Sequence, residues 1–264
     1  MYRKHFGFTR LPFGKELAIE DLFPSASSRE LGVRLAHLLE LRGIGLATGE
    51  VGSGKTTSTR MVVTALHTGR HRVFYVQLTT GNVMDLFKSI AWEMGLATER
   101  SRAALHRRIR DESSRLCAER IHPVLIVDEA QHLRSDVLED LRLLTNYEMD
   151  SQNRLCLLLV GQAELRRRIS MSVHEALNQR IVMRHHLTGL TREELPAYLA
   201  HHLKLAGTEQ PLFEPAAVEA LWQATNGQPR KVNLLADHAL LAAAASRART
   251  VGIEAIQVAL AEST

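Results

Sequence analysis

The sequence predicts an α/β fold, in which a parallel sheet is covered by helices, followed by a small all-helical domain. Short apolar runs with almost no polar alternation recur along the first two thirds of the chain, and predicted helices separate them. The last third has helical spacing and no strand-like run. Strands that are buried on both faces of a sheet have this continuous apolar character.

The five predicted strands are the apolar runs at residues 44–48, 73–78, 124–127, 155–160 and 181–183. Helical segments lie between them, at residues 55–68, 83–95, 101–120, 135–148 and 163–173. A single run of this kind also fits a buried turn of helix, but five in regular alternation favour a doubly wound parallel sheet.

After about residue 187 the pattern changes to helices alone. The predicted helices are residues 191–206, 214–225, 229–246 and 252–262, with glycine and proline at the breaks between them. Thr191 and Glu194 have the spacing of a capping box, in which each side chain bonds to the other residue's backbone amide. We therefore expect two domains, residues 1–187 and residues 188–264.

Composition excludes several classes of protein. The 264 residues are 45% hydrophobic and 23% charged, with a net charge of +4, which is ordinary for a globular protein and unlike a disordered chain. Cys117 and Cys156 have no paired spacing, so neither a disulfide framework nor a zinc cluster is expected. No apolar stretch approaches about 18 residues, and the N-terminus lacks a signal peptide. These features predict a cytoplasmic protein without a membrane partner.

Residues 49–56, Gly-Glu-Val-Gly-Ser-Gly-Lys-Thr, match the phosphate-loop pattern G-x-x-x-x-G-K-[ST] between a predicted strand and a predicted helix. The glycines let successive amides and the helix N-terminus point at phosphate groups. Lys55 would neutralise the β- and γ-phosphates, and the Thr56 hydroxyl would bind Mg²⁺. A chance glycine-rich turn is the alternative. The predicted nucleotide-binding residues are Gly49, Glu50, Val51, Gly52, Ser53, Gly54, Lys55, Thr56, Thr57 and, from the resemblance described below, Arg230.

Asp128 and Glu129 follow directly after the apolar run 124–127. Ligands bind outside the carboxyl ends of strands in open α/β sheets, so Asp128 is the predicted Mg²⁺ ligand. Glu129 is the predicted base that polarises the attacking water. An Asp-Glu pair after a strand also fits a helix N-cap, but its combination with a phosphate loop favours the catalytic interpretation. Hydrolysis is preferred to a kinase reaction because no second basic substrate site is evident.

Together with these motifs, GQAEL at 161–165, LNQRI at 177–181 and GQPRKVNLL at 227–235 resemble the AAA+ ATPases. The chain is most similar to the ExeA/GspA-like subfamily, which includes secretion ATPases and transposition regulators of the TnsC, TniB and MuB kind. The resemblance covers residues 1–260. It implies an αβα P-loop NTPase domain, a helical lid, and ATP with Mg²⁺ bound between neighbouring subunits.

The resemblance also implies three further catalytic residues. Gln162 matches the sensor-1 position, although Ala163 stands where the subfamily often has proline. Arg180 matches the arginine finger that reaches a neighbour's site, and such fingers change rates by roughly 10³–10⁵. Arg180 also fits a residue that merely ends a helix. Arg230 matches sensor 2, for which an ordinary surface arginine is the alternative.

Within this subfamily, the end of the chain at Thr264 favours a transposition regulator, because secretion-type members carry a membrane segment after the lid. The expected protein would assemble on duplex DNA as a ring or helical filament. It would select a target site, recruit or activate a transposase or target-selection protein, and disassemble on hydrolysis. The alternatives are a secretion-pathway ATPase and a nucleotide-gated scaffold with little turnover.

Residues 99–120 contain seven arginines against four acidic residues, which suggests a surface for the DNA backbone. A solvated helix face or an intersubunit salt-bridge surface is the alternative, and charge patterning slightly favours it. Elements near the second strand match those that line the pore of related proteins. The predicted DNA contacts are Thr79, Thr80, Lys88, Arg100, Arg107 and Arg108.

Overall fold

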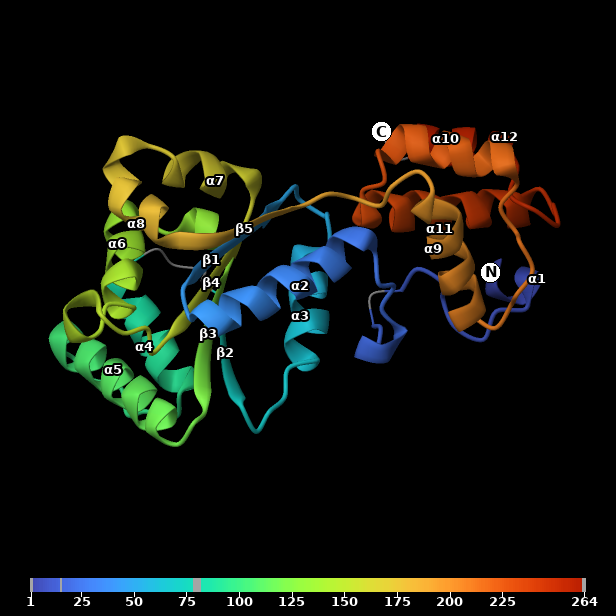
Figure 1. The fold of residues 1–264 in the computed structure, drawn as a ribbon. Coiled ribbons are helices and arrows are strands. Elements are labelled where there is room, and N and C mark those ends of the chain that lie inside the picture. The colour runs from blue at the N-terminus through green and yellow to red at the C-terminus, as the bar shows by residue number, and fades with distance from the viewer. Residues whose placement is uncertain (1, 15, 78–81, 263–264) are drawn as a thin grey trace. The chain divides into compact units, whose positions relative to one another are not determined.

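A five-stranded parallel sheet forms the centre of the larger part of the chain in the computed structural model, which describes residues 2–14, 16–77 and 82–262 (Figure 1). Its strands are β1 (Ile44–Gly49), β2 (His71–Gln77), β3 (His122–Asp128), β4 (Cys156–Gly161) and β5 (Ile181–Leu187). The order is β2-β3-β4-β1-β5, so β2 and β5 are the edges. β1, β3 and β4 are buried along nearly their whole length, as their apolar runs predict.

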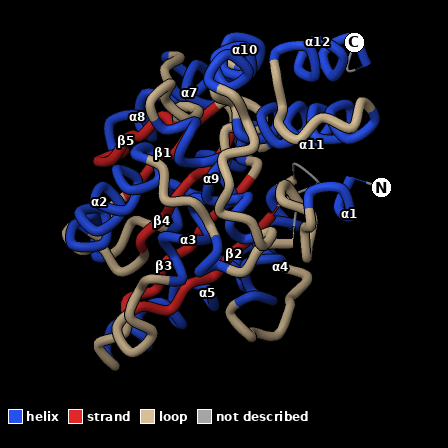
Figure 2. Tube along the Cα trace, turned by 90° about the vertical axis from the view of Figure 1, so that its right-hand side faces the viewer, coloured by secondary structure: helices blue, strands red, loops and turns tan. Residues whose placement is uncertain are grey.

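Helices cover both faces of this sheet (Figures 1 and 2). On one face, the apolar side chains of α2 (Ala26–Leu41) and α3 (Lys55–Thr64) pack against the strands. The other face is covered by five helices. They are α4 (Val83–Glu93), α5 (Arg102–Ala118), α6 (Ser135–Leu144), α7 (Ala163–Ile169) and α8 (Glu175–Arg180). This architecture confirms the predicted α/β class.

The remaining helices form a second compact unit. They are α1 (Tyr2–Phe6), α9 (Glu194–Leu205), α10 (Pro215–Thr225), α11 (Pro229–Ala245) and α12 (Ile253–Glu262). The chain passes into this unit between Leu187 and Thr188. In the region that the structure describes, none of the helices is long and apolar enough to cross a lipid bilayer.

The N-terminal segment differs from the expected domain organisation. Residues up to Ser27 group with the C-terminal helices and not with the sheet, and Gly52–Gly54 group with them as well. Tyr2, Phe8 and Phe13 explain the position of the first segment, because all three are buried in the apolar core of the C-terminal unit. An apolar segment far away in sequence thus completes that core.

The predicted capping box at Thr191 is present in the structure, whereas not every helix lies within the predicted segments. The Thr191 amide donates to Glu194 Oε2 at 3.0 Å, and the Glu194 amide donates to Thr191 Oγ1 at 3.3 Å, which is the reciprocal pairing of a capping box. Helix α2 was not predicted. Its buried residues Leu31, Leu35 and Leu38 have helical spacing, so the sequence did carry a signal for it.

The strand order decides where the chemistry lies. β3, β4 and β1 are neighbours and run in parallel, so their carboxyl ends meet at one edge of the sheet. Asp128 ends β3, Gly161 ends β4 and Gly49 ends β1. The phosphate loop and the residues that follow β3 and β4 therefore gather at this edge.

Candidate active site

The phosphate loop joins β1 to α3, and its backbone requires glycine at two positions. Gly52 and Gly54 have φ angles of +83° and +87°, in the left-handed region that other residues rarely adopt. Between them, the Ser53 hydroxyl is buried without a hydrogen-bond partner among the described residues. An orphaned buried donor beside a helix N-terminus fits a loop shaped to surround phosphate oxygens.

Lys55 begins α3, and its side chain turns back under the loop. Its Nζ donates to the carbonyl oxygens of Gly49 at 3.0 Å and Glu50 at 2.8 Å. The side chain is buried, so its charge lies in a region with little water. A buried ammonium group next to helix amides makes this loop strongly attractive to phosphate. Val51 and Thr57 are exposed beside it.

Asp128 is buried at the end of β3, with three hydrogen bonds to its carboxylate. Thr56 Oγ1 donates to Oδ2 at 2.9 Å, Tyr75 Oη donates to the same oxygen at 2.7 Å, and the Glu129 amide donates to Oδ1 at 2.8 Å. Burial, and then this bond to Asp128, raise the pKa of Tyr75, so its hydroxyl keeps its proton. The hydroxyl of Thr56 and the carboxylate of Asp128 are the hard oxygen donors that Mg²⁺ prefers.

Glu129 has a φ of +53°, a left-handed conformation that is strained for a side chain of this size. Its Oε2 accepts a hydrogen bond of 2.6 Å from the side-chain amide of Gln131. Strained backbone is often found at functional sites, where the surrounding contacts hold it in place. The hydrogen bond from Gln131 fixes one oxygen of the Glu129 carboxylate.

The three residues assigned by resemblance lie on different elements. Gln162 is the N-cap residue of α7, directly after β4, and Arg180 is the last residue of α8, before the edge strand β5. Arg230 is the second residue of α11, and its amide donates to the Gly52 carbonyl at 3.3 Å within the same unit. The roles of these residues remain predictions.

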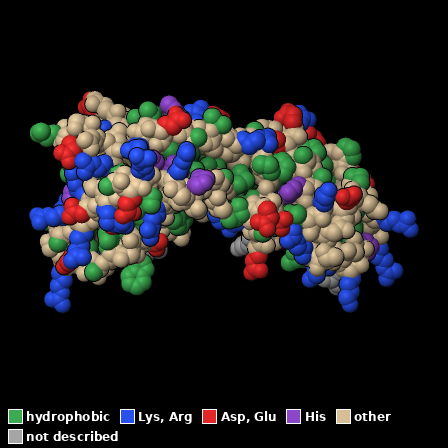
Figure 3. All heavy atoms as spheres, turned by 60° about the horizontal axis from the view of Figure 1, so that its bottom comes forward, with side chains coloured by type: hydrophobic (Ala, Val, Ile, Leu, Met, Phe, Trp, Pro, Cys, Tyr) green, Lys and Arg blue, Asp and Glu red, His purple; other side chains and the backbone are tan. Residues whose placement is uncertain are grey.

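The predicted DNA contacts do not form one row. Thr79 and Thr80 lie outside the described residues, and Arg100 precedes the N-cap Ser101 of α5. Arg108 pairs with Glu99 at 2.7 Å, and Arg115 on the same helix pairs with Glu112 at 2.7 Å. At least these two of the seven arginines are therefore paired within the chain. On the face that Figure 3 shows, basic side chains are scattered among acidic and neutral ones.

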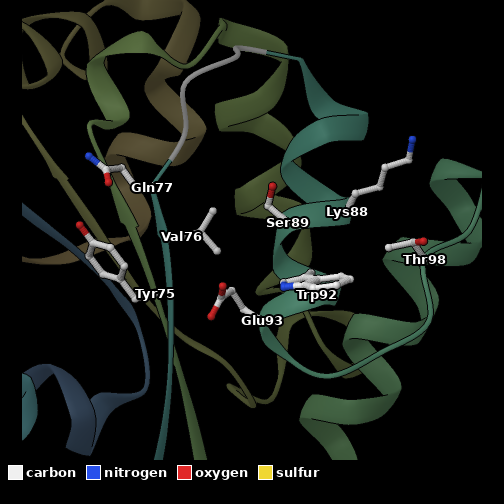
Figure 4. A pocket seen from close by; sticks show the side chains of 8 residues that line it. All are labelled: Tyr75, Val76, Gln77, Lys88, Ser89, Trp92, Glu93 and Thr98. Carbon is white, nitrogen blue, oxygen red and sulfur yellow. The ribbon is translucent and has the colours of Figure 1, made fainter.

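Lys88 lines a pocket of about 340 Å³ beside the edge strand β2 (Figure 4). Tyr75 and Val76 point to opposite sides of this strand, and Trp92 and Lys88 come from α4. Tyr75 is among the residues that line the pocket, and its hydroxyl reaches Asp128.

Sequence reasoning assigned no role to Tyr75 or Gln131, which both contact predicted catalytic carboxylates. Tyr75 carries a hydroxyl within the predicted strand 73–78, and Gln131 lies two residues after Glu129, so the available signals were a polar group in a strand and closeness to the predicted catalytic pair. Which carboxylate each one contacts depends on the pairing of β2 with β3 and on the turn after β3. Neither the strand pairing nor the conformation of the turn is visible in the sequence.

Comparison with known proteins gives the family. A model described as AAA domain matches residues 38–169, which is half of the chain. The chain belongs to the AAA domain family. It is also 37% identical over 249 residues to General secretion pathway protein A of Aeromonas hydrophila. The match covers 92% of this chain and 45% of that protein, so the chain spans less than half of the length of this relative.

Similar solved structures support the same fold. Cdc6p from Pyrobaculum aerophilum has a TM-score of 0.67 at 16% identity, covering 98% of this chain and 70% of that one. The RuvB Holliday junction branch migration motor of Thermotoga maritima has a TM-score of 0.57 at 17% identity, covering 96% of this chain and 73% of that one. At such low identity these likenesses concern the fold alone. They agree with the AAA domain match in fold.

The expected role as a transposition regulator is wrong. The curated relative belongs by name to a secretion pathway, which was the alternative interpretation. The expectation depended on where the chain ends, and a chain that matches less than half of its relative gives no basis for that argument. The transposase or target-selection partner depended on the same interpretation and is withdrawn with it. The expected absence of a membrane partner came from the lack of a long apolar stretch and stays a prediction. Duplex DNA and a cytoplasmic location remain predictions.

Proposed function

We propose that the chain is the ATP-hydrolysing module of a secretion-pathway ATPase. The observation that carries this proposal is the joint presence of a complete phosphate loop, the Asp128 and Glu129 pair, and 37% identity to General secretion pathway protein A. Turnover of ATP would supply the energy for assembling a membrane component of the pathway.

Each site residue has a role that follows from its charge and its position. Lys55 and the loop amides bind the phosphate groups, while Thr56 and Asp128 hold Mg²⁺, which when bound offsets negative charge on the phosphates. Glu129 accepts a proton from the attacking water, and Gln162 orients that water through its side-chain amide. Arg230 contacts the γ-phosphate from the start of α11. Tyr75 keeps the Asp128 carboxylate in one orientation through its hydroxyl.

A neighbouring subunit would complete the site. Arg180 lies beside an edge strand, where a guanidinium group can reach a second copy of the chain. Its planar charge would stabilise the transferred phosphoryl group. The proposal therefore includes a homo-oligomer that hydrolyses ATP faster than an isolated subunit.

The first test is hydrolysis itself. Purified protein with Mg²⁺ and ATP should release phosphate, and Lys55→Ala should reduce nucleotide affinity at least about 10-fold, because its buried ammonium group faces the phosphates. Lys204→Ala is the control, since Lys204 is exposed and pairs with Glu209 on the surface. Absence of phosphate release by the wild-type chain, at any protein concentration, would contradict the proposal.

The second test concerns the pathway. A chimera of General secretion pathway protein A, in which this chain replaces the matching region, should support secretion in Aeromonas hydrophila, and its Lys55→Ala form should not. A chimera that accumulates normally and hydrolyses ATP, but supports no secretion, would exclude this pathway. A Glu129→Gln chimera separates turnover from scaffolding, because a scaffold needs only nucleotide binding and would still support secretion.

A further inference from the structure

Gln131 is a buried polar side chain that joins two parts of the site. It lies in the short 3₁₀ turn after β3 and is 6% exposed. Its amide nitrogen donates to Glu129 Oε2 at 2.6 Å, and its amide oxygen accepts from the Gln162 backbone amide at 3.0 Å. Both ends of one planar amide are thus used, one on the end of β3 and one on the end of β4.

The neighbouring residues are arranged around this side chain. A Cβ atom at Gly161 would lie 2.8 Å from the Gln131 side-chain oxygen, so only glycine leaves room for it there. The Arg168 guanidinium donates to the carbonyl oxygens of Gln131 at 2.6 Å and Leu133 at 2.7 Å. These contacts hold the backbone of the turn in place, and therefore also the Cα atom from which the Gln131 side chain extends.

The hydrogen bond from Gln131 distinguishes the two carboxylate oxygens of Glu129. It occupies Oε2, while Oε1 has no hydrogen-bond partner in the part of the chain that the structure describes. The backbone of Glu129 is itself held in the left-handed region, at a φ of +53°. One oxygen is therefore held by the protein, and the other is left to accept a proton.

We propose that Gln131 is a positioning residue that holds the Glu129 carboxylate at a fixed position relative to Gln162. The inference rests on the proposed function, because Glu129 and Gln162 act there on the same water. A fixed amide between them orders both groups before nucleotide binds, so that little rearrangement is needed during the reaction.

The test compares two variants at one site. Gln131→Met has a similar length and removes both hydrogen bonds, whereas Gln131→Glu keeps an acceptor for the Gln162 amide and loses the donor to Glu129. Each should lower kcat about 10- to 100-fold, because small misplacements of a base have effects of this size. Nucleotide affinity should stay within about twofold, since neither variant touches the phosphate loop. Gln223→Met is the matched control, because Gln223 donates to Glu219 on the surface of α10.

A double-mutant cycle separates positioning from a merely structural role. In a Glu129→Gln background, Gln131→Met should change the residual rate by less than about twofold, because the carboxylate that it positions is gone. Equal losses in both backgrounds would overturn the inference, as would an unchanged or higher kcat in the single variants. If Gln131→Met does not fold, Gln131→Glu gives the same comparison. Absence of hydrolysis by the wild-type chain would instead overturn the proposed function, and this inference with it.

Discussion

The predicted chemistry depends on charged side chains that the protein has removed from water. Lys55 and Asp128 are both buried, and each is held by hydrogen bonds to the chain around it. A buried charge interacts more strongly with a ligand than an exposed one, because less solvent screens it. The carboxylates and the cation at this edge of the sheet are therefore prepared for phosphate and a hard metal ion before either binds.

Glu129→Gln should separate binding from hydrolysis. The amide keeps the size of the side chain and cannot accept the proton, so kcat should fall about 10²- to 10⁴-fold while nucleotide affinity is retained. Phosphate release and binding of a fluorescent ATP analogue measure the two quantities. A parallel loss of affinity would mean that Glu129 supports the loop and is not the base.

His202 gives a second prediction at this scale. Its Nδ1 donates to the Pro12 carbonyl at 3.0 Å, and burial lowers the pKa of His202 to about 4, from an ordinary value near 6.5. As the pH falls, the unfolded chain takes up a proton on His202 that the folded chain excludes. The neutral imidazole therefore contributes fully to the stability of the folded state above pH 6.5, and this contribution is lost as the pH falls to 4. The free energy of unfolding should be lower by about 2–3 kcal/mol at pH 4.5.

Urea unfolding at pH 7.5 and pH 4.5 checks the predicted contribution of His202 to stability. The difference in free energy of unfolding between wild type and His202→Gln should change over this interval by that amount, because glutamine does not titrate but can still donate to Pro12. A difference that is the same at both pH values would show that His202 titrates normally in the folded protein.

At the scale of elements, the N-terminal segment is part of the C-terminal helical unit. The apolar side chains of Tyr2, Phe8 and Phe13 are buried among α9, α10, α11 and α12. The ring of Phe13 lies 5.4 Å from that of His202 and 6.4 Å from that of Phe213. This segment therefore contributes to the stability of helices that follow it by almost 200 residues.

Phe13→Ala should reduce the free energy of unfolding by about 3 kcal/mol, because it leaves a cavity in this core. Leu11→Ala is the control; Leu11 is 49% exposed and its truncation should cost less than about 1 kcal/mol. Denaturant titration of the full chain measures both. Equal effects of the two substitutions would contradict the packing described for Phe13.

At the scale of the whole molecule, the proposed function includes an assembly of several copies, in which Arg180 at the end of α8 reaches a neighbour's site. Arg180→Ala should lower kcat at least about 10³-fold if its guanidinium acts as an arginine finger. A mixture with Lys55→Ala subunits should recover part of the activity, because each variant supplies the part that the other lacks. Phosphate release from the separate and mixed proteins tests this, and no recovery on mixing would place Arg180 in its own subunit's site.

The class of fold and the phosphate loop could be predicted from the sequence because both are local patterns. Buried parallel strands read as apolar runs, and the loop needs its glycines and lysine at set spacings over eight residues. Helix α2 lies outside the predicted helices, although its buried residues Leu31, Leu35 and Leu38 have helical spacing.

The relation of the N-terminal segment to the C-terminal helices, and the contacts of Tyr75 and Gln131, could not be read from the sequence. They join residues that are far apart along the chain, or depend on how neighbouring strands are paired and how a turn is formed. Local patterns reflect the conformation of a few successive residues, whereas these contacts follow from the order of strands β2-β3-β4-β1. Only folding brings Tyr75 to Asp128 and sets Gln131 between Glu129 and Gln162.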